Sequence, residues 1–409
     1  MKNSLCLYAA LVGLSIGAAH GAAGGGDSYN LVEKGRYLAT LGDCTACHTM
    51  QGKPPFSGGV AIDTPFGILL GSNITPDQQT GIGRWSFDDF QNVMSNVHSP
   101  GGTRLYGAMP YTAYTKVSRA DNQAIWAYLQ TLEPVNNQVE TNQLPFPFNV
   151  RISLMVWNWL NFEKGEYKTD ARKSDSGIAV LIWSRGSVIA ALAIRPEICL
   201  VVTRTASFLQ GGNLQSWVAP NITADPHVGI GKWTEEEIVQ YLKTGANRFD
   251  IASGPMAEAV DNSTQHWKDE DLMAVAVYLK DGEIADSKPN TLEAEDPTMV
   301  AGKAVYTDRC SAWHTPSGEG ISHLFPKLAG APLINGSDPA SLIHVVLAGN
   351  RAGSTDAAPS GPAMPSFAWN LSDENVADVL TYVRNSWGNA APVVSSEKVR
   401  DLRKTLRGQ

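Results

Sequence analysis

Apolar residues recur at intervals of three and four positions in five segments of the chain. This spacing places their side chains on one face of an α-helix, while polar residues occupy the opposite face. The sequence therefore predicts five amphipathic helices, whose apolar stripes are Phe90/Val93/Met94/Val97, Ile125/Tyr128/Leu129/Leu132, Ile238/Tyr241/Leu242, Leu272/Val275/Ala276/Leu279 and Val376/Val379/Leu380/Val383/Trp387.

Polar and helix-breaking residues indicate where these helices begin and end. The expected N-cap residues are Ser86, Ser118, Thr234 and Ser372, residues 269–271 supply an acidic first turn, and the expected stops are Pro134, Gly282 and Gly388. Alternating apolar runs bounded by hairpin turns are almost absent. The predicted class is therefore all-α, with long irregular loops between short helices.

One block of sequence occurs twice. Asn-Ile-Thr-Pro-Asp at residues 73–77 and Gly-Ile-Gly-Arg-Trp-Ser at residues 81–86 recur as Asn-Ile-Thr-Ala-Asp at 221–225 and Gly-Ile-Gly-Lys-Trp-Thr at 229–234. The closing helix of each copy has a third counterpart near the C-terminus. We therefore expect three tandem units of roughly a hundred residues each, at residues 27–134, 165–285 and 295–390.

Three segments lie outside these units. Residues 1–23 have a basic start, a short apolar stretch and small residues, which predicts a cleaved signal peptide rather than an uncleaved anchor. Residues 135–164, which we call the strap, are too apolar for a solvated linker, so they either pack over the chain's own domains or dock a partner or the membrane interface. In the tail, residues 391–409, Val399, Leu402 and Leu406 share one face among basic residues, which suggests a membrane-surface helix or a solvated terminal helix.

Charge and cysteine content narrow the chemistry. The 409 residues carry 40 acidic and 32 basic side chains, a formal charge of −8, which argues against nucleic acid as a partner. The five cysteines are an odd number, and they are too few for a disulfide scaffold. Cys6 lies in the signal peptide, so the chemical role of the other cysteines must be inferred from their spacing.

Cys44, Cys47 and His48 form the attachment motif of a c-type haem. Two thiols three positions apart can add to the two vinyl groups of one porphyrin, and the adjacent histidine can bind its iron. A thioredoxin-like redox pair or half a zinc site would also use Cys-x-x-Cys. The directly following histidine, the signal peptide and the lack of a second cysteine pair favour haem.

Each unit offers one loop methionine as the opposite axial ligand: Met109, Met256 and Met364, each beside a Pro/Gly turn. A His/Met pair suits electron transfer, because both axial positions of the iron are filled. A single such methionine could equally fill a gap in a core. Recurrence at the same point of three units favours the ligand interpretation.

The third unit carries a variant motif, Cys310-Ser311-Ala312-Trp313-His314, with tryptophan in place of the second thiol. It can bind haem by one thioether at most, with His314 and Met364 as axial ligands. The tryptophan codon differs from a cysteine codon by one base. A recent mutation or a sequencing error therefore explains the tryptophan as well as a designed variant does.

The second unit carries no attachment motif as written. Residues 177–202 are apolar and include Cys199. One interpretation is a membrane-helix candidate interrupted by Arg185 and Arg195, and a second is an inserted segment. A third interpretation is a frame-shift across residues 177–207. Shifted by one base, the codons of residues 187–194 can encode Cys-Gly-Ala-Cys-His near position 190, where the repeat requires it. We favour the frame-shift, which would restore a second haem opposite Met256.

On these residues the chain resembles the three-haem cytochrome c subunits of bacterial membrane-bound dehydrogenases for alcohol, gluconate, 2-ketogluconate, sorbitol or fructose. The resemblance covers nearly all of the mature sequence and is carried by Gly35-Arg36-Tyr37-Leu38, the two repeated blocks, Ala108-Met109-Pro110-Tyr111, Trp157-Asn158-Trp159 and Met364-Pro365-Ser366-Phe367. The sequence departs from the family at two of three attachment sites.

The resemblance implies an electron-transfer subunit without a catalytic site of its own. Such subunits take electrons from a quinone- or flavin-dependent dehydrogenase and pass them through haem c to ubiquinone, on the periplasmic side of the inner membrane and at its surface. The resemblance implies one haem at the intact attachment motif. It implies up to three haems if the second and third sites are intact in the natural gene.

Two other classes of protein stay open. A peroxidase-like dihaem enzyme would need an iron without a methionine ligand and a distal histidine or glutamate; the candidates by type are His98, His227, His266, His323 and His344. A non-redox scaffold with purely structural haems is the second alternative.

Overall fold

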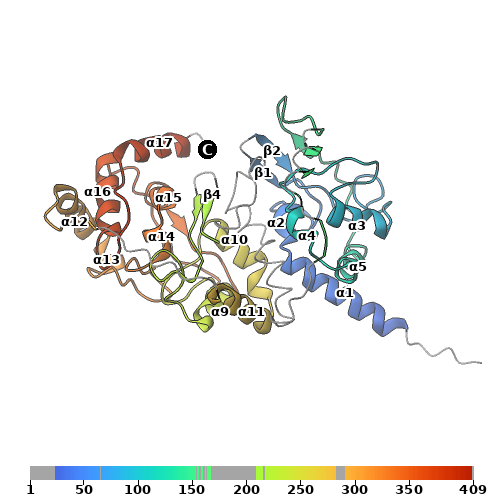
Figure 1. Ribbon diagram of the computed structural model, residues 1–409, viewed down its shortest axis with the longest axis horizontal. Helices are drawn as coiled ribbons and strands as arrows, with labels where there is room; N and C mark the ends of the chain where they lie inside the picture. Colours follow the sequence, from blue (N-terminus) through green and yellow to red (C-terminus); the bar gives the residue numbers. More distant parts are fainter. Residues whose placement is uncertain are drawn as a thin grey trace, which may run out of the picture.

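The computed structural model describes residues 24–64, 66–152, 154–155, 158–159, 162, 164–166, 209–214, 217–281 and 291–407. Within these ranges the regular structure is mostly helical, and the strands are two to four residues long. In Figure 1 the elements of the first unit lie at one end, those of the third unit at the other, and those of the second between them. The expected predominance of helices is therefore confirmed.

The helices group along the chain as the sequence predicts. In the first unit they are α1 (Gly24–Leu41), α2 (Cys44–His48), α3 (Phe87–Asn96), α4 (Tyr111–Tyr114) and α5 (Arg119–Leu129). The second unit has α9 (Glu235–Thr244), α10 (Pro255–Asn262), the 3₁₀ helix η3 (Thr264–His266) and α11 (Asp269–Lys280). The third has α12 (Pro297–Arg309), α13 (Ser311–His314), α14 (Pro332–Asn335), α15 (Ala340–Ala348) and α16 (Asp373–Arg384), followed by α17 (Ser396–Arg407).

Three small antiparallel sheets accompany the helices. β1 (Ala61–Thr64) pairs with β2 (Gly67–Leu70), which pairs with β3 (Asn142–Gln143); β4 (Gly212–Leu214) pairs with β5 (Trp217–Ala219), and β6 (Asn350–Arg351) with β7 (Ala363–Met364). The β1–β2 hairpin is absent from the sequence prediction, because four-residue strands are too short to show an alternating pattern.

The expected N-caps are confirmed. The Ser86 hydroxyl accepts a hydrogen bond from the Asp89 backbone N–H at 3.2 Å, and the Asp89 carboxylate accepts one from the Ser86 N–H at 2.8 Å. Thr234 and Glu237 form the same reciprocal capping box at the start of α9. Ser118 caps α5 and Ser372 caps α16. These bonds satisfy N–H groups that the first helical turn leaves unpaired.

The end of α16 differs from the prediction. The apolar stripe extends to Trp387, yet the helix ends at Arg384. Asn385 caps it, because its side-chain amide donates to Thr381 O at 3.0 Å and to Ala391 O at 3.2 Å. Trp387 then adopts a left-handed conformation with φ 55° and packs on the rings of Tyr306 and Tyr382. Its apolar side chain therefore packs on core residues although Trp387 lies beyond the end of the helix.

The two copies of the repeated block fold alike. Asn73 Oδ1 accepts from the N–H of Thr75 at 3.0 Å, and Asn221 Oδ1 accepts from that of Thr223 at 2.8 Å. In each copy the isoleucine N–H then bonds the threonine carbonyl at 2.9 Å and the tryptophan N–H bonds the isoleucine carbonyl. The duplication in the sequence is therefore also a duplication of local structure.

Three separate clusters of buried apolar side chains hold the described chain together. The first surrounds Phe90, Tyr114 and Leu129; the second surrounds Trp267 and Leu272. The third is built from α12, α14, α15, α16 and α17, with cluster members that include Tyr306, Ile343, Val376, Leu380 and Val399. The clusters follow the expected units with two exceptions: Leu41 of the first unit packs on the second cluster, and the third cluster extends into the tail through Val394 and Val399.

Polar contacts join each unit to the next. Tyr37 in α1 hydrogen-bonds Asp271 in α11, and its hydroxyl oxygen accepts the Lys268 N–H at 3.0 Å. The second and third units meet where Val218 N–H donates to Ser341 Oγ at 2.6 Å. Neighbouring units are thus held by specific bonds between elements far apart in sequence.

A glycine in each terminal unit lets two helices cross closely. A Cβ on Gly35 in α1 would lie 1.9 Å from the Ala124 carbonyl oxygen in α5. A Cβ on Gly302 in α12 would lie 2.1 Å from the Asp378 carbonyl oxygen in α16. Because the neighbour is backbone, a side chain at either position would have to push the helices apart.

We expect Gly302→Ala to destabilise the protein by about 1 to 3 kcal/mol, the usual cost of overpacking. The sign is informative, because alanine in a helix interior otherwise stabilises by about 0.5 to 1 kcal/mol relative to glycine. The matched control is Gly336→Ala, where φ is −59° and the nearest atom to a new Cβ is 3.6 Å away. Denaturant unfolding of both variants measures the difference, and equal effects would contradict the close crossing.

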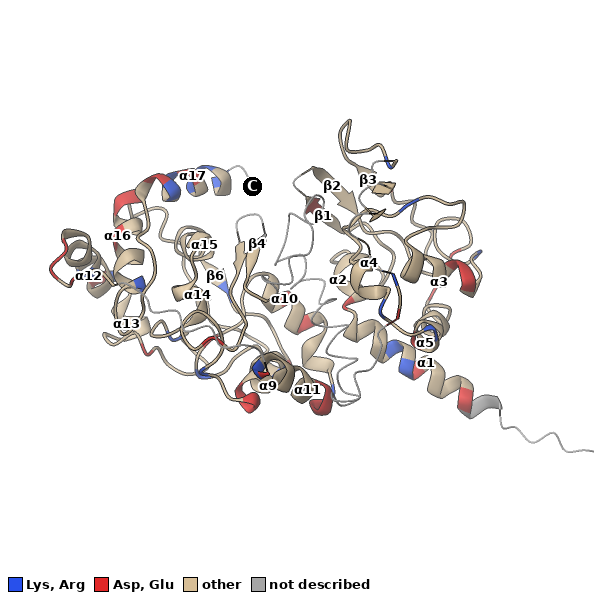
Figure 2. Cartoon of the chain, in the orientation of Figure 1, with Lys and Arg blue, Asp and Glu red and all other residues tan. Residues whose placement is uncertain are grey.

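The C-terminal helix corrects one interpretation. Basic residues, coloured blue in Figure 2, lie along α17, as the sequence suggested. However, Val399 is fully buried, and Leu402 and Leu406 pack on the third cluster. Arg403 pairs with Asp373 at 2.7 Å and so ties α17 to α16. The apolar face of α17 therefore packs on the third cluster, and the structure does not support the interpretation of α17 as a membrane-surface helix.

The strap exposes its large apolar side chains. Phe146, Ile152 and Trp159 are 80%, 70% and 83% exposed. Its polar groups face the first unit instead: Arg151 donates to the Arg104 carbonyl and lies over the Tyr106 ring, and buried Asn158 accepts from the Tyr111 hydroxyl at 2.9 Å. The described part of the strap is therefore held by these polar bonds and by buried Leu144, while Phe146, Ile152 and Trp159 face outwards.

Some expectations fall on residues that the structure does not describe. The signal peptide, residues 1–23, and the segment of the frame-shift hypothesis, residues 177–207 with Cys199, lie outside the described ranges. Among the helices in the described ranges, none combines the length and the hydropathy that a membrane span needs.

Candidate haem sites

The first site is built on a single helical turn. α2 places Cys44, Cys47 and His48 at positions i, i+3 and i+4, so their side chains leave the same face. Asp43 precedes this turn in a left-handed conformation, with φ 50°. The short motif thus needs only one turn of helix to gather two thiols and an imidazole.

A backbone carbonyl orients His48. Its Nδ1 lies 2.7 Å from the Ser72 carbonyl oxygen, so Nδ1 carries the proton and donates it. Burial lowers the pKa of His48, which keeps the imidazole neutral. The lone pair of Nε2 is therefore available to a metal, with the ring held by the bond that metal-binding histidines usually make.

Both thiols of the first site are free and desolvated. Burial, together with the nearby Asp43 carboxylate, raises the pKa of Cys44 and of Cys47 to about 12. The two sulfurs pack on the first apolar cluster together with Met109. This surrounding suits thiols that become thioethers, and it disfavours the thiolate of a redox-active pair.

Asp43 is a buried carboxyl beside this motif. Burial raises its pKa to about 8, and its Oδ1 has no hydrogen-bond partner among the described residues. Glu258, in α10 of the second unit, is close enough to contribute to this rise in pKa. Asp43 and Glu258 therefore place ionisable groups where the first and second units meet.

A close backbone approach shapes the first site. A Cβ on Gly71 would lie 1.7 Å from the Cys47 carbonyl oxygen, so only glycine fits there. Gly71 directly precedes Ser72, which holds His48, and the repeated block begins at Asn73. Gly71 and Ser72 are absent from the sequence prediction. Ser72 acts through its backbone carbonyl, so its side chain gives no signal in the sequence. The signal that could have revealed both residues is their position just before the repeated block.

Met109 lies in the turn that leads into α4. Its N–H bonds the Tyr106 carbonyl at 3.2 Å, and its own carbonyl accepts the Tyr111 N–H at 2.7 Å. The side chain is half-buried and packs on the cluster that also contacts Cys44 and Cys47. The structure therefore brings the expected methionine, cysteines and apolar cluster of the first unit together.

The third unit contains an apolar cavity that gathers its expected ligands. Cys310, Trp313, His314 and Met364 all line it, and the rest of the lining is mostly aliphatic and aromatic side chains of the third cluster. His314 is oriented like His48, with Nδ1 3.0 Å from the Pro326 carbonyl oxygen. Burial lowers the pKa of His314, which again leaves a neutral ring.

The donor set and the lining both fit a haem. A neutral imidazole, a thioether sulfur, a thiol and apolar walls are the groups that hold this cofactor in electron-transfer proteins. His314 and Met364 come from segments fifty residues apart, one at the end of α13 and one in β7. Their meeting at one cavity is a property of the tertiary structure.

The second unit shows only half of its expected site. Met256 follows Pro255 at the start of α10 and is half-buried against the second cluster. Its expected partner motif lies in residues 177–207, outside the described ranges. A ligand pair in the second unit therefore stays a prediction.

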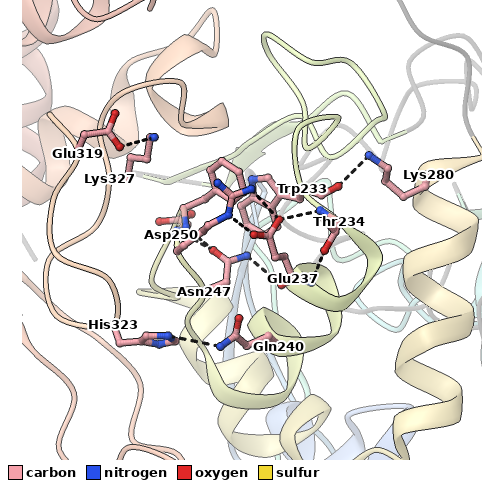
Figure 3. A network of polar contacts seen from close by, with 12 residues as sticks. Trp233, Thr234, Glu237, Gln240, Asn247, Asp250, Lys280, Glu319, His323 and Lys327 are labelled. Atoms are coloured by element: carbon pink, nitrogen blue, oxygen red, sulfur yellow. Dashed lines mark hydrogen bonds and ion pairs between the residues drawn. The ribbon is translucent and has the colours of Figure 1, made fainter. Parts of the chain in front are cut away.

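The second unit also contributes to the third cavity, which the sequence did not suggest. Asp250 and Ile251, in the loop between α9 and α10, line it. The Asn247 side chain shapes this loop by accepting the N–H groups of Phe249 and Asp250 at 2.8 and 2.9 Å, in the network of Figure 3. Burial raises the pKa of Asp250 to about 6.

Three of the five histidines considered for a peroxidase make other contacts. His98 Nδ1 lies 2.6 Å from the Asn96 carbonyl oxygen, and His323 contacts Gln240 at 3.5 Å (Figure 3). His344 stacks on Trp217 at 4.2 Å between ring centroids. Among the described residues that line the third cavity, His314 is the sole histidine. The peroxidase interpretation is therefore not favoured.

Comparison with known proteins bears on this assignment. The model of the cytochrome c family matches residues 299–387, which span the third cavity's Cys310, His314 and Met364. The chain is 36% identical over 395 residues to the gluconate 2-dehydrogenase cytochrome c subunit of Pantoea cypripedii, covering 91% of this chain and 90% of that protein.

Two further relatives match at similar length. The cytochrome c subunit of alcohol dehydrogenase (quinone) from Gluconobacter oxydans (strain 621H) is 33% identical over 431 residues, covering 99% of this chain and 88% of that protein. The fructose dehydrogenase cytochrome subunit of Gluconobacter japonicus is 32% identical over 406 residues, covering 91% and 82%.

Proposed function

The chain belongs to the family of cytochrome c subunits of gluconate, alcohol and fructose dehydrogenases, and on that premise we propose that it relays electrons from a catalytic dehydrogenase subunit to ubiquinone. The family carries covalently bound haem c, which supplies one-electron transfer when bound. The partner that oxidises the substrate would use a quinone or a flavin. The relay would operate on the periplasmic side of the bacterial inner membrane, after cleavage of the signal peptide.

The observation that carries this proposal is the third cavity. It presents His314 and Met364 to one apolar space, and the His314 ring is fixed by the Pro326 carbonyl. Two axial side chains leave no open position for a substrate, which is the arrangement of an electron carrier. The first site offers the same pair in His48 and Met109.

The tertiary contacts support three cytochrome c domains, at residues 27–134, 165–285 and 295–390. The three apolar clusters, the duplicated loop and the glycine-mediated helix crossings of the first and third units are consistent with this division. Direct bonds between neighbouring units would keep their sites at constant separations. Constant separation favours electron transfer along the chain, because the process requires no rearrangement of units.

The outward-facing strap is the docking surface that we propose for the catalytic subunit. Phe146, Ile152 and Trp159 present large apolar side chains, and the anchors Arg151 and Asn158 keep the segment on the first unit. Aromatic residues in an exposed apolar patch are typical of protein interfaces. A partner seated there would lie beside the first unit and its haem.

We expect the purified full-length chain to accept electrons but to oxidise no sugar, sugar acid or alcohol. The physical reason is that each proposed iron has two protein ligands and that the described sites hold no substrate-binding constellation. Reduction by dithionite, reoxidation by a short-chain ubiquinone and substrate assays with and without the catalytic subunit test this. Substrate oxidation by the chain alone would overturn the proposal, and so would failure of the reduced protein to transfer electrons to the quinone.

The ligand spectrum separates the relay from the peroxidase alternative. We expect the irons held by the first and third units to be six-coordinate and low-spin, since each unit offers a histidine and a methionine as candidate axial ligands. A high-spin, five-coordinate iron that reacts with peroxide would favour the haem enzyme instead.

A further inference from the structure

The third attachment motif keeps the geometry of the first although it has lost a thiol. The backbone carbonyl oxygen of Cys310 accepts the N–H groups of Trp313 and His314, each at 3.0 Å, so the three side chains lie on one face of a single turn. Trp313 therefore holds the place that Cys47 holds in the first unit. All three residues line the third cavity.

The indole of Trp313 does not fill this cavity. The side chain is 51% exposed, and its ring meets the Phe325 ring edge-on at 5.1 Å between centroids. An indole that had collapsed into the cavity would be buried by the aliphatic walls. Trp313 thus lies at the rim, and the space between His314 and Met364 stays available.

The position of His314 does not depend on a second thiol. Its Nδ1 is held by Pro326, in a loop that is itself closed by the Ile321–Phe325 backbone bond at 2.9 Å and the Leu328–Gly318 bond at 2.7 Å. The axial histidine is therefore positioned by the protein before any bond to a porphyrin forms. Cys310 alone has to supply the covalent link, because the sequence has no other cysteine after Cys199.

We propose that the third cavity holds its haem through a single thioether to Cys310, with the second vinyl group intact and packed beside Trp313. This inference deepens the proposed function and rests on it. In the attachment step the S–H bond of Cys310 adds across one vinyl double bond. A carbon–sulfur bond forms, the thiol hydrogen passes to the neighbouring vinyl carbon, and no electrons enter or leave.

Burial is consistent with this chemistry. It raises the pKa of the Cys310 thiol to about 11, so the sulfur carries at neutral pH the hydrogen that the addition transfers. Since the third unit has no second cysteine, it also cannot lose its thiol to an internal disulfide. One thioether bond and two axial ligands would then together retain the cofactor.

Two measurements on the full-length chain test the proposal. Protease digestion followed by mass spectrometry should find one haem on the peptide that contains Cys310, in addition to the haem on the Cys44–Cys47 peptide. In a Cys44→Ser/Cys47→Ser background, the pyridine haemochrome band of the remaining haem should lie between those of a haem with two thioethers and a haem with none.

Substitution of the tryptophan supplies the decisive comparison. Trp313→Cys should move that band to the two-thioether position, because a second thiol then stands at the cavity rim. The matched control is Trp369→Cys, at an 81% exposed tryptophan of the same unit outside the cavity, which should leave the band where it was. Cys310→Ser should make the haem extractable by acidified acetone.

The outcomes separate this inference from the proposed function. A Cys310 peptide without haem, beside a Cys44–Cys47 peptide that carries one, overturns the single thioether and leaves the relay standing. A band that does not respond to Trp313→Cys overturns it as well. If neither peptide carries haem, the proposed function itself is wrong.

Discussion

The double variant Cys44→Ser/Cys47→Ser is expected to lose the covalent haem of the first unit entirely. Both sulfurs are desolvated on the first apolar cluster, and no other thiol lies within this unit. Without the thioethers, the cofactor is retained only by His48 and Met109. Loss of so large a core component should also destabilise the first unit by at least 3 to 5 kcal/mol, roughly the cost of removing a buried aromatic side chain.

Peptide mapping for haem and thermal unfolding of the full-length chain measure this result. The control is Ala46→Ser in the same turn, which adds one hydroxyl between the two cysteines and keeps both thiols and His48. It should retain the haem and unfold within a few degrees of the parent. Non-extractable haem at the parental level in the double variant would contradict the attachment site.

The second large effect is expected from Met109→Ala, in the midpoint potential of the first haem. A thioether ligand favours the reduced iron, so its removal should lower the potential. Axial ligands shift haem potentials over a range of about 0.8 V, and we expect a decrease of roughly 100 mV or more here. The spectral signature of sulfur coordination should disappear with it.

Redox titration followed by absorbance measures both changes. Met50→Ala is the matched control, since Met50 is an exposed methionine of the same unit and does not belong to the apolar cluster. It should leave the potential and the spectrum unchanged. If Met109→Ala also changed neither, Met109 would be a packing residue and another group would be the ligand.

Several features of this protein were determined by sequence alone because they depend on neighbours within one helical turn. Ser86 and Thr234 cap their helices through residues three positions further on. Cys44, Cys47 and His48 reach one face by their spacing. The two Asn-Ile-Thr blocks make the same local hydrogen bonds. Local geometry of this kind follows from the order of residues, and distant contacts do not alter it.

The tertiary structure decided what each surface meets. The apolar stripe of α17 is compatible with a membrane surface or with a protein core, and burial of Val399 selects the core. The apolar strap is compatible with self-packing, yet Trp159 faces outwards. Ser72 and Pro326 orient His48 and His314 through carbonyl groups that every residue possesses, so no side-chain pattern could reveal them. An apolar face or a backbone acceptor specifies no partner by itself; the partner follows only from contacts between residues far apart in the chain.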